Sequence, residues 1–153
     1  MNAAARGREW LASNLPHRGS MSLLDEVVSW DGARLHARAR SHASPANPLR
    51  LDGKLAIACA IEYGAQAAAA HGALLAEGRP APAAGYLASV RGVTFHAARL
   101  DDAGEAIDIE VERAGEGAGA VLYAFRVSAA GRALAEGRVA IVLEAPQPAA
   151  NPS

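Results

Sequence analysis

The stretch LAIACAIEYGAQAAAAHGALL, residues 55–75, is almost free of charge and decides the fold. Alanine, leucine and glutamate favour helix, and no proline interrupts residues 54–77, so we expect one long helix over that range. Gly78 and then Pro80 follow it, which is typical of the end of a helix. This helix is apolar on nearly all of its sides, which predicts burial on nearly all of its sides.

Three polar residues interrupt the apolar run, Glu62, Gln66 and His71. A span of about 20 apolar residues would cross a bilayer, but a charge at its centre costs roughly 3 kcal/mol. We therefore expect the helix in the core of a protein and not in a membrane. Gly64 and Gly72 are expected to let a neighbouring backbone approach the helix closely.

The composition is that of one globular domain, with 153 residues, 51% hydrophobic and 20% charged, and a net charge of −1. We expect a single domain over residues 1–145 and a flexible tail over residues 146–153. The charge balance argues against binding to nucleic acid or to an anionic membrane surface. The lone Cys59 and the spacing of the histidines argue against a metal site. The N-terminal residues lack the apolar run of a signal peptide, so we expect a cytoplasmic protein.

Most of the remaining segments have the pattern of strands, apart from a short helix expected over residues 6–12. Residues 34–40 alternate strictly between polar and apolar side chains. The expected strands are residues 23–30, 34–40, 86–96, 106–113, 121–128 and 132–143. Two strands, one apolar helix and four strands predict an α+β fold, an antiparallel sheet of five to six strands wrapped around the helix. Because such a sheet leaves an edge to cover, we expect a dimer.

Glu62 is the first candidate for a catalytic residue. Its neighbours Ala58, Cys59, Ile61 and Ala65 are apolar, so the side chain is expected to be buried. Burial of a carboxylate favours the protonated, neutral form, which is the form that a general acid needs. The structural alternative is a glutamate near the helix surface, or one paired with an arginine across an interface.

The histidines and Asn47 are weaker candidates on residue chemistry alone. His17 follows Pro16 and can be either a base or a turn residue, whereas Asn47 next to Pro48 is typical of a turn. The other four histidines are most simply explained as surface or strand residues: His36, His42, His71 and His96.

Taken together, several motifs resemble the hot-dog-fold 3-hydroxyacyl-acyl-carrier-protein dehydratases of fatty-acid synthesis. The similarity is strongest to the dehydratase-like subunits of aryl-polyene and related polyketide clusters. It covers most of the chain and rests on the order and spacing of five segments. These are LPHR (15–18), LLDEV (23–27), IEYGAQ (61–66), YLASV (86–90) and GRALAEG (131–137).

The resemblance implies a hot-dog fold and a lyase that removes water from a 3-hydroxyacyl thioester to give a trans-2-enoyl thioester. It assigns the general acid to Glu62, a positioning role to Gln66, and an oxyanion-binding backbone N–H to Ser89. It implies no bound cofactor, because the substrate is carried on the phosphopantetheine of an acyl carrier protein or of CoA. The expected partners are an acyl carrier protein and a second hot-dog protomer, either a second copy or a related dehydratase.

The chain departs from this family at the catalytic base. The family has a histidine in a Gly-His-Phe-Pro loop, and here that position is Asn47, which cannot take a proton near neutral pH. His17 or His42 can supply the base from a shifted position, or a partner subunit can supply it. The chain can also be an acyl-binding subunit without turnover, or a hot-dog thioesterase in which Glu62 activates water. In each case an acyl tunnel is expected beside Glu62.

Overall fold

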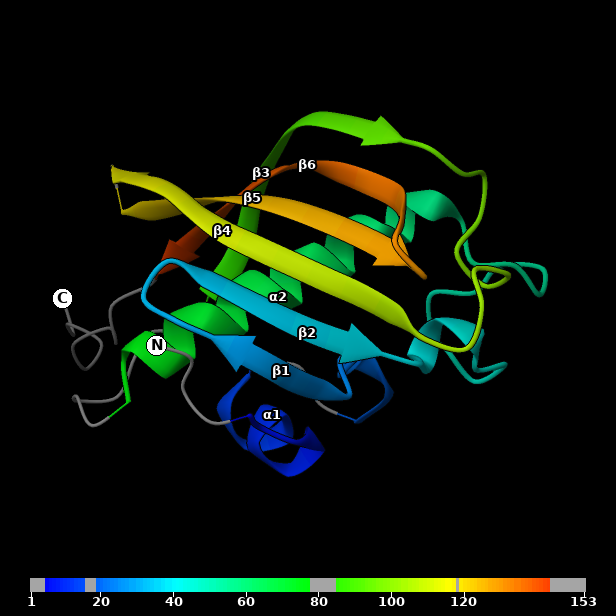
Figure 1. The fold of residues 1–153 in the computed structure, drawn as a ribbon, viewed down its shortest axis with the longest axis horizontal. Coiled ribbons are helices and arrows are strands. Elements are labelled where there is room, and N and C mark those ends of the chain that lie inside the picture. Colours follow the sequence, from blue (N-terminus) through cyan, green and yellow to red (C-terminus); the bar gives the residue numbers. More distant parts are fainter. Residues whose placement is uncertain (1–4, 16–18, 78–84, 118, 144–153) are drawn as a thin grey trace, which may run out of the picture.

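The computed structural model describes residues 5–15, 19–77, 85–117 and 119–143, and in them a six-stranded sheet curves around one long helix (Figure 1). The helices are α1 (Arg8–Asn14) and α2 (Ala60–Leu75), with short 3-10 turns at Gly19–Met21, Ser41–Ala43 and Ile57–Cys59. The strands are β1 (Glu26–Trp30), β2 (Arg34–Ala39), β3 (Gly85–Phe95), β4 (Ile107–Gly117), β5 (Ala120–Ala129) and β6 (Arg132–Leu143). The expected tail, residues 146–153, lies outside the described residues.

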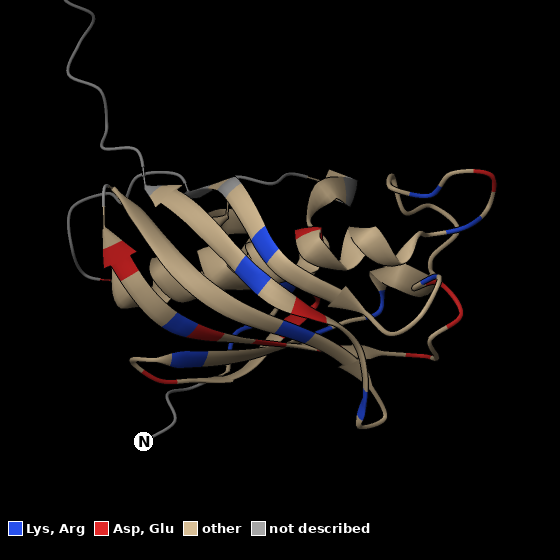
Figure 2. Ribbon diagram, turned by 90° about the horizontal axis from the view of Figure 1, so that it is seen from above, with Lys and Arg blue, Asp and Glu red and all other residues tan. Residues whose placement is uncertain are grey.

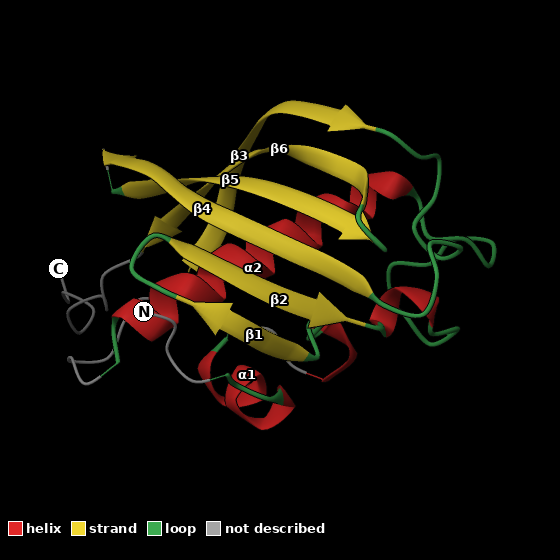
Figure 3. Cartoon of the chain, in the orientation of Figure 1, coloured by secondary structure: helices red, strands yellow, loops and turns green. Residues whose placement is uncertain are grey.

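The sheet is antiparallel throughout, in the order β1-β2-β4-β5-β6-β3, which confirms the expected α+β architecture (Figure 3). The β1–β2 hairpin turns where Asp31-Gly32 predicts it. The Asp31 carboxylate accepts the backbone N–H groups of Ala33 and Arg34 at 2.8 and 2.9 Å. These two hydrogen bonds lower the pKa of Asp31 and hold the turn.

Helix α2 is shorter than its apolar sequence predicts, because it begins at Ala60 and not at residue 54. Leu55 accepts the backbone N–H of Leu100 at 2.7 Å, and Ala56 forms a bridge with Arg99. These backbone groups pair with the segment after β3 and are therefore not available to a helix. At 1.5 Å per residue, the 16 residues of α2 span about 24 Å.

Phe125 of β5 joins the sheet to α2. A Cβ atom on Gly64 would lie 2.8 Å from Cγ of Phe125, so only glycine fits there. The expected close approach at Gly64 is confirmed, although the neighbour is a side chain and not a backbone. At Gly72 the expectation is wrong, because nothing lies within 4 Å of the corresponding position. Most of α2 is buried, and Glu62 is its only charged residue. The charged residues lie mainly on the strands and loops (Figure 2).

The β3 edge of the sheet exposes large apolar side chains. Leu87, Val90 and Phe95 are 39%, 38% and 43% exposed. Their partners on β6 across the ladder, which are Ile141, Val139 and Ala135, are all in the core. The three β3 side chains therefore share the inner face of the sheet but lack a cover among the described residues. Within those residues, no helix is long and apolar enough to cross a bilayer.

Candidate active site

Glu62 lies in the first turn of α2 and is half-buried. The expected full burial is wrong because the helix starts only two residues earlier. Ala58 is therefore exposed and Cys59 half-buried in the preceding 3-10 turn. Burial, with the charge of Glu62 added to it, raises the pKa of the Cys59 thiol. The start of α2 has no side-chain cap, but the backbone N–H of Ala60 already donates to Ile57 O and Ala58 O of the preceding 3-10 turn.

Asn47 is held in a buried hydrogen-bond network and is only 6% exposed. Its Nδ2 donates to the backbone oxygen of Ser41 at 2.9 Å and to the hydroxyl of Tyr63 at 3.1 Å. Its Oδ1 accepts the backbone N–H of Leu49 at 2.9 Å. The amide is thus fully engaged in fixing the loop before α2.

Tyr63, the residue after Glu62 in α2, connects this loop to the helix through its hydroxyl. The sequence analysis missed this contact. The Ser41 hydroxyl donates to the backbone oxygen of Leu23 at 2.6 Å, so the Tyr63 hydroxyl, 2.7 Å away, donates to Ser41 and accepts from Asn47. Tyr63 is fully buried, which raises its pKa. The hydroxyl of a buried tyrosine needs a hydrogen-bond partner, so a tyrosine in this apolar helix was the one feature of the sequence that could have indicated the contact.

Gln66 lies one turn beyond Glu62 and is fully buried. Its Oε1 accepts the backbone N–H of Leu23 at 2.9 Å, and its Nε2 donates to the backbone oxygen of Met21 at 2.8 Å. The side chain therefore ties the segment before β1 to α2. Its predicted roles, to position Glu62 and to bind substrate, stay predictions.

Ser89 lies in β3 and is half-buried. It is opposite Ala140 of β6, and a bulge interrupts the ladder between Leu87 and Ser89. A bulge leaves one residue without a partner on the neighbouring strand and is common beside active sites. The residue that the bulge leaves out of the ladder is Ala88, whereas Ser89 is paired, so the oxyanion role of the Ser89 backbone N–H stays a prediction. His17, the other expected site residue, lies outside the described residues.

His42 and His71 are both fully buried, so the expectation of surface or strand histidines is wrong for them. Nε2 of His42 donates to the backbone oxygen of Gly104 at 2.7 Å, while its buried Nδ1 has no partner among the described residues. His71 donates from Nε2 to Asp31 O and accepts at Nδ1 from Tyr123, both at 2.8 Å. Burial lowers the pKa of both histidines and raises that of Tyr123 to about 12. Each ring is thus buried and bonded to a backbone oxygen, so the role of His42 as a base stays a prediction.

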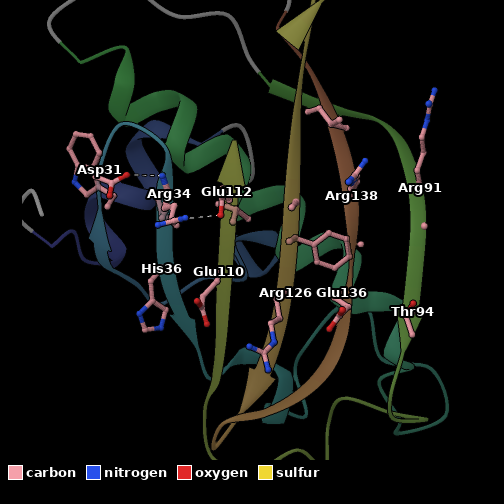
Figure 4. Close-up of a pocket in the computed structure, with 18 of the residues that line it drawn as sticks. Asp31, Arg34, His36, Arg91, Thr94, Glu110, Glu112, Arg126, Glu136 and Arg138 are labelled. Atoms are coloured by element: carbon pink, nitrogen blue, oxygen red, sulfur yellow. Dashed lines mark hydrogen bonds and ion pairs between the residues drawn. The ribbon is translucent and has the colours of Figure 1, made fainter. Parts of the chain in front are cut away.

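A groove of about 980 Å³ lies on the outer, charged face of the sheet (Figure 4). Arginines and glutamates of β2, β4, β5, β6 and β3 line it, and none of the candidate catalytic residues does. The expected acyl tunnel beside Glu62 is a different feature and stays a prediction. Within the described ranges, no three metal-binding side chains gather at one place.

A protein-family model described as ApeP-like, ApeP dehydratase, matches residues 10–151 of the chain. The match extends over nearly the whole sequence. No curated protein has a sequence that matches.

Solved structures share the fold. The dehydratase heterocomplex ApeI:P from Xenorhabdus doucetiae is 23% identical, with a TM-score of 0.77 and coverage of 88% of this chain and 91% of that one. AziG from S. sahachiroi is 19% identical, with a TM-score of 0.53 and coverage of 79% of this chain and 90% of that one. A thioesterase from Pseudomonas aeruginosa is 12% identical, with a TM-score of 0.63 and coverage of 91% of this chain and 96% of that one. The architecture is thus the hot-dog fold, which dehydratases and thioesterases both use.

Proposed function

The chain belongs to the ApeP-like family of ApeP dehydratases, and from this we propose that it is the acid-bearing half of a mixed dehydratase dimer. In this dimer, water leaves a 3-hydroxyacyl thioester to give a trans-2-enoyl thioester. The partner is a related hot-dog dehydratase that keeps the family's histidine. The solved relative ApeI:P, a dehydratase heterocomplex, makes such an arrangement a precedent within the fold.

The engaged amide of Asn47 is the observation that carries this proposal. An amide cannot accept a proton near neutral pH, and here both ends of the side chain already hold the loop. His42, the nearby alternative in sequence, is buried with its Nε2 on Gly104. The described residues around the loop therefore offer an acid, Glu62, but no base that a substrate can reach. A second protomer that supplies the base completes the pair.

The chemistry divides between the two protomers as follows. The partner's histidine removes the proton on C2, and that electron pair forms the C2–C3 double bond. As the C3–O bond breaks, the Glu62 carboxyl gives its proton to the departing hydroxyl, which leaves as water. The thioester oxygen gains negative charge in this step, and the family resemblance assigns its stabilisation to the backbone N–H of Ser89.

The exposed β3 edge supports the dimer. Leu87, Val90 and Phe95 turn apolar surface to solvent on the strand that ends the sheet. An unpaired apolar edge is a template for a strand of another chain. Pairing there would extend the sheet and cover these side chains.

The test is a mass measurement on a 3-hydroxyacyl carrier protein, incubated with the chain alone and with the chain co-purified with a histidine-bearing relative. We expect the mass of one water to be lost only with the mixed preparation. Water loss by the chain alone would contradict the mixed dimer and point to a base within this chain, such as His17. Release of a free thiol would show a thioesterase. If the two chains co-purify but the relative alone removes water as fast as the mixed preparation, this chain is a non-catalytic, acyl-binding subunit.

A further inference from the structure

Tyr63, in the first turn of α2, and Ser41 form a pair of hydrogen-bonded hydroxyl groups 2.7 Å apart. The pair belongs to a chain of hydrogen bonds that all run in one direction. Nδ2 of Asn47 can only donate, so the Tyr63 oxygen accepts from it at 3.1 Å. The Tyr63 hydroxyl then donates to Ser41, whose own hydroxyl donates to the backbone oxygen of Leu23 at 2.6 Å. Hydrogen bonds that run head to tail polarise and strengthen one another.

Gln66 attaches α2 to the same segment at a second point. Its Oε1 accepts the backbone N–H of Leu23 at 2.9 Å, and its Nε2 donates to the backbone oxygen of Met21 at 2.8 Å. Both backbone groups of Leu23 are therefore bound to α2, the N–H directly by Gln66 and the oxygen by Tyr63 through Ser41. Since Tyr63 and Gln66 lie about one turn apart, the ring of hydrogen bonds closes through the helix. Attachment at two points fixes the rotation of this turn about the helix axis, which a single bond would leave free.

Glu62 is part of the turn that these attachments hold. It directly precedes Tyr63 and lies one turn before Gln66, at a spacing that puts the two Cβ atoms about 5–6 Å apart. The start of α2 has no side-chain cap, so the position of its first turn depends on contacts with other segments. The direction in which the Glu62 side chain leaves the helix is therefore set by the hydrogen bonds of Tyr63 and Gln66.

We propose that Tyr63 and Ser41 are positioning residues for the acid, and that their hydroxyl pair holds the Glu62 carboxyl where the departing hydroxyl of the substrate takes its proton. The inference rests on the proposed function, since it names the residues that align the acid of that reaction. A displacement of about 1 Å at a reacting group can cost about 10²-fold in rate. The Tyr63 hydroxyl keeps its proton to donate to Ser41, because burial raises its pKa.

The hydroxyl of Tyr63, and not its ring, separates positioning from a role in stability alone. The ring is part of the core in either case, and Tyr63→Phe keeps it while removing the hydroxyl. Tyr123 of β5 offers a matched control, because it is also a core tyrosine and its hydroxyl donates to His71 at 2.8 Å. At 1.5 Å per residue, His71 is about 14 Å from Glu62 along α2, so Tyr123→Phe removes a buried hydroxyl far from the acid.

The test measures the rate of water loss from a 3-hydroxyacyl carrier protein by the mixed dimer, with the variant in this chain alone and association checked in parallel. We expect Tyr63→Phe to lower kcat about 10–100-fold and to leave KM nearly unchanged, because it misaligns the acid without removing a substrate contact. Ser41→Ala should have the same effect, and Ser41→Thr, which keeps a hydroxyl, should restore most of the rate. Tyr123→Phe should leave kcat unchanged.

A double-variant cycle with Glu62→Gln distinguishes positioning from a loss of stability. In Glu62→Gln, Tyr63→Phe should cause no further loss, because a residue that acts through the acid has no effect once the acid is gone. An equal fractional loss in both backgrounds, an unchanged kcat in Tyr63→Phe, or the same loss in Tyr123→Phe would overturn the positioning role. If Tyr63→Phe keeps the rate while Glu62→Gln loses it, the positioning fails alone and the proposed dehydration stands. If Glu62→Gln keeps the rate, the proposed function fails and the positioning fails with it.

Discussion

At the scale of single residues, Asn47 holds the loop before α2 through its side-chain hydrogen bonds. Asn47→Ala removes three hydrogen bonds and leaves the buried Tyr63 hydroxyl without its donor. We expect the free energy of unfolding to fall by about 1–3 kcal/mol, as measured by urea denaturation. Asn47→Asp is the matched variant, because it keeps the acceptor for Leu49 and loses the donor to Ser41 and Tyr63. An unchanged midpoint for both variants would contradict a structural role for Asn47.

The buried histidines give stability a dependence on pH. His42 and His71 have pKa values below the ordinary 6.5, so the unfolded chain takes up protons that the folded chain resists. Stability from these groups is complete above about pH 6.5 and is lost as the pH falls toward the folded-state values. Each histidine contributes at most about 1.4 kcal/mol per pH unit in that window. Urea midpoints at pH 7.5 and 5.5 should differ in this direction, and less so in His71→Gln. A midpoint higher at pH 5.5 would contradict the account.

Residue chemistry singled out Glu62 as the candidate acid but did not predict how its side chain is surrounded. Glu62 stands out because it is the single charge in an apolar helix. Its partial exposure follows from where the helix starts, which depends on contacts with residues far away in sequence. The link between Asn47, Ser41 and Tyr63 was out of reach for the same reason, since the three residues come from different segments.

At the scale of elements, the contact between α2 and β5 requires glycine at one position of the helix and not at another. Gly64→Ala would place Cβ 2.8 Å from Phe125, and we expect a loss of about 1–3 kcal/mol in unfolding free energy. Gly72→Ala meets open space and should gain up to about 1 kcal/mol from helix propensity. Thermal denaturation of the two variants checks this pair. Equal shifts in Tm would contradict the packing described.

The periodicity of the sequence was sufficient to predict the helix and the strands, because the alternation along β2 and β4 and the apolar run of α2 are local signals. The start of α2 was not predictable from them. Residues 55–57 are apolar enough for a helix, but their backbone pairs with residues 98–100. Tertiary hydrogen bonds outweigh helix propensity there.

At the scale of the whole molecule, the β3 edge should govern association with the partner. Val90→Lys places a charge on the apolar edge, and charged edge strands resist pairing with another chain. We expect this variant to lose co-purification with the histidine-bearing relative. Leu51→Lys is the control, since Leu51 is a 77% exposed apolar residue outside the strands, and this variant should leave association unchanged. Retained association in Val90→Lys would place the interface elsewhere.

The division of acid and base between two protomers is tested most directly by dehydration in a mixed dimer that carries Glu62→Gln in this chain alone. The glutamine keeps the size of the side chain but has no proton to give. The measurement is the rate of water loss from a 3-hydroxyacyl carrier protein, followed by mass, with association checked in parallel. Our account predicts an intact mixed dimer whose rate falls by about 10²–10⁴. An unchanged rate in an intact dimer would show that this chain's carboxyl takes no part in the reaction.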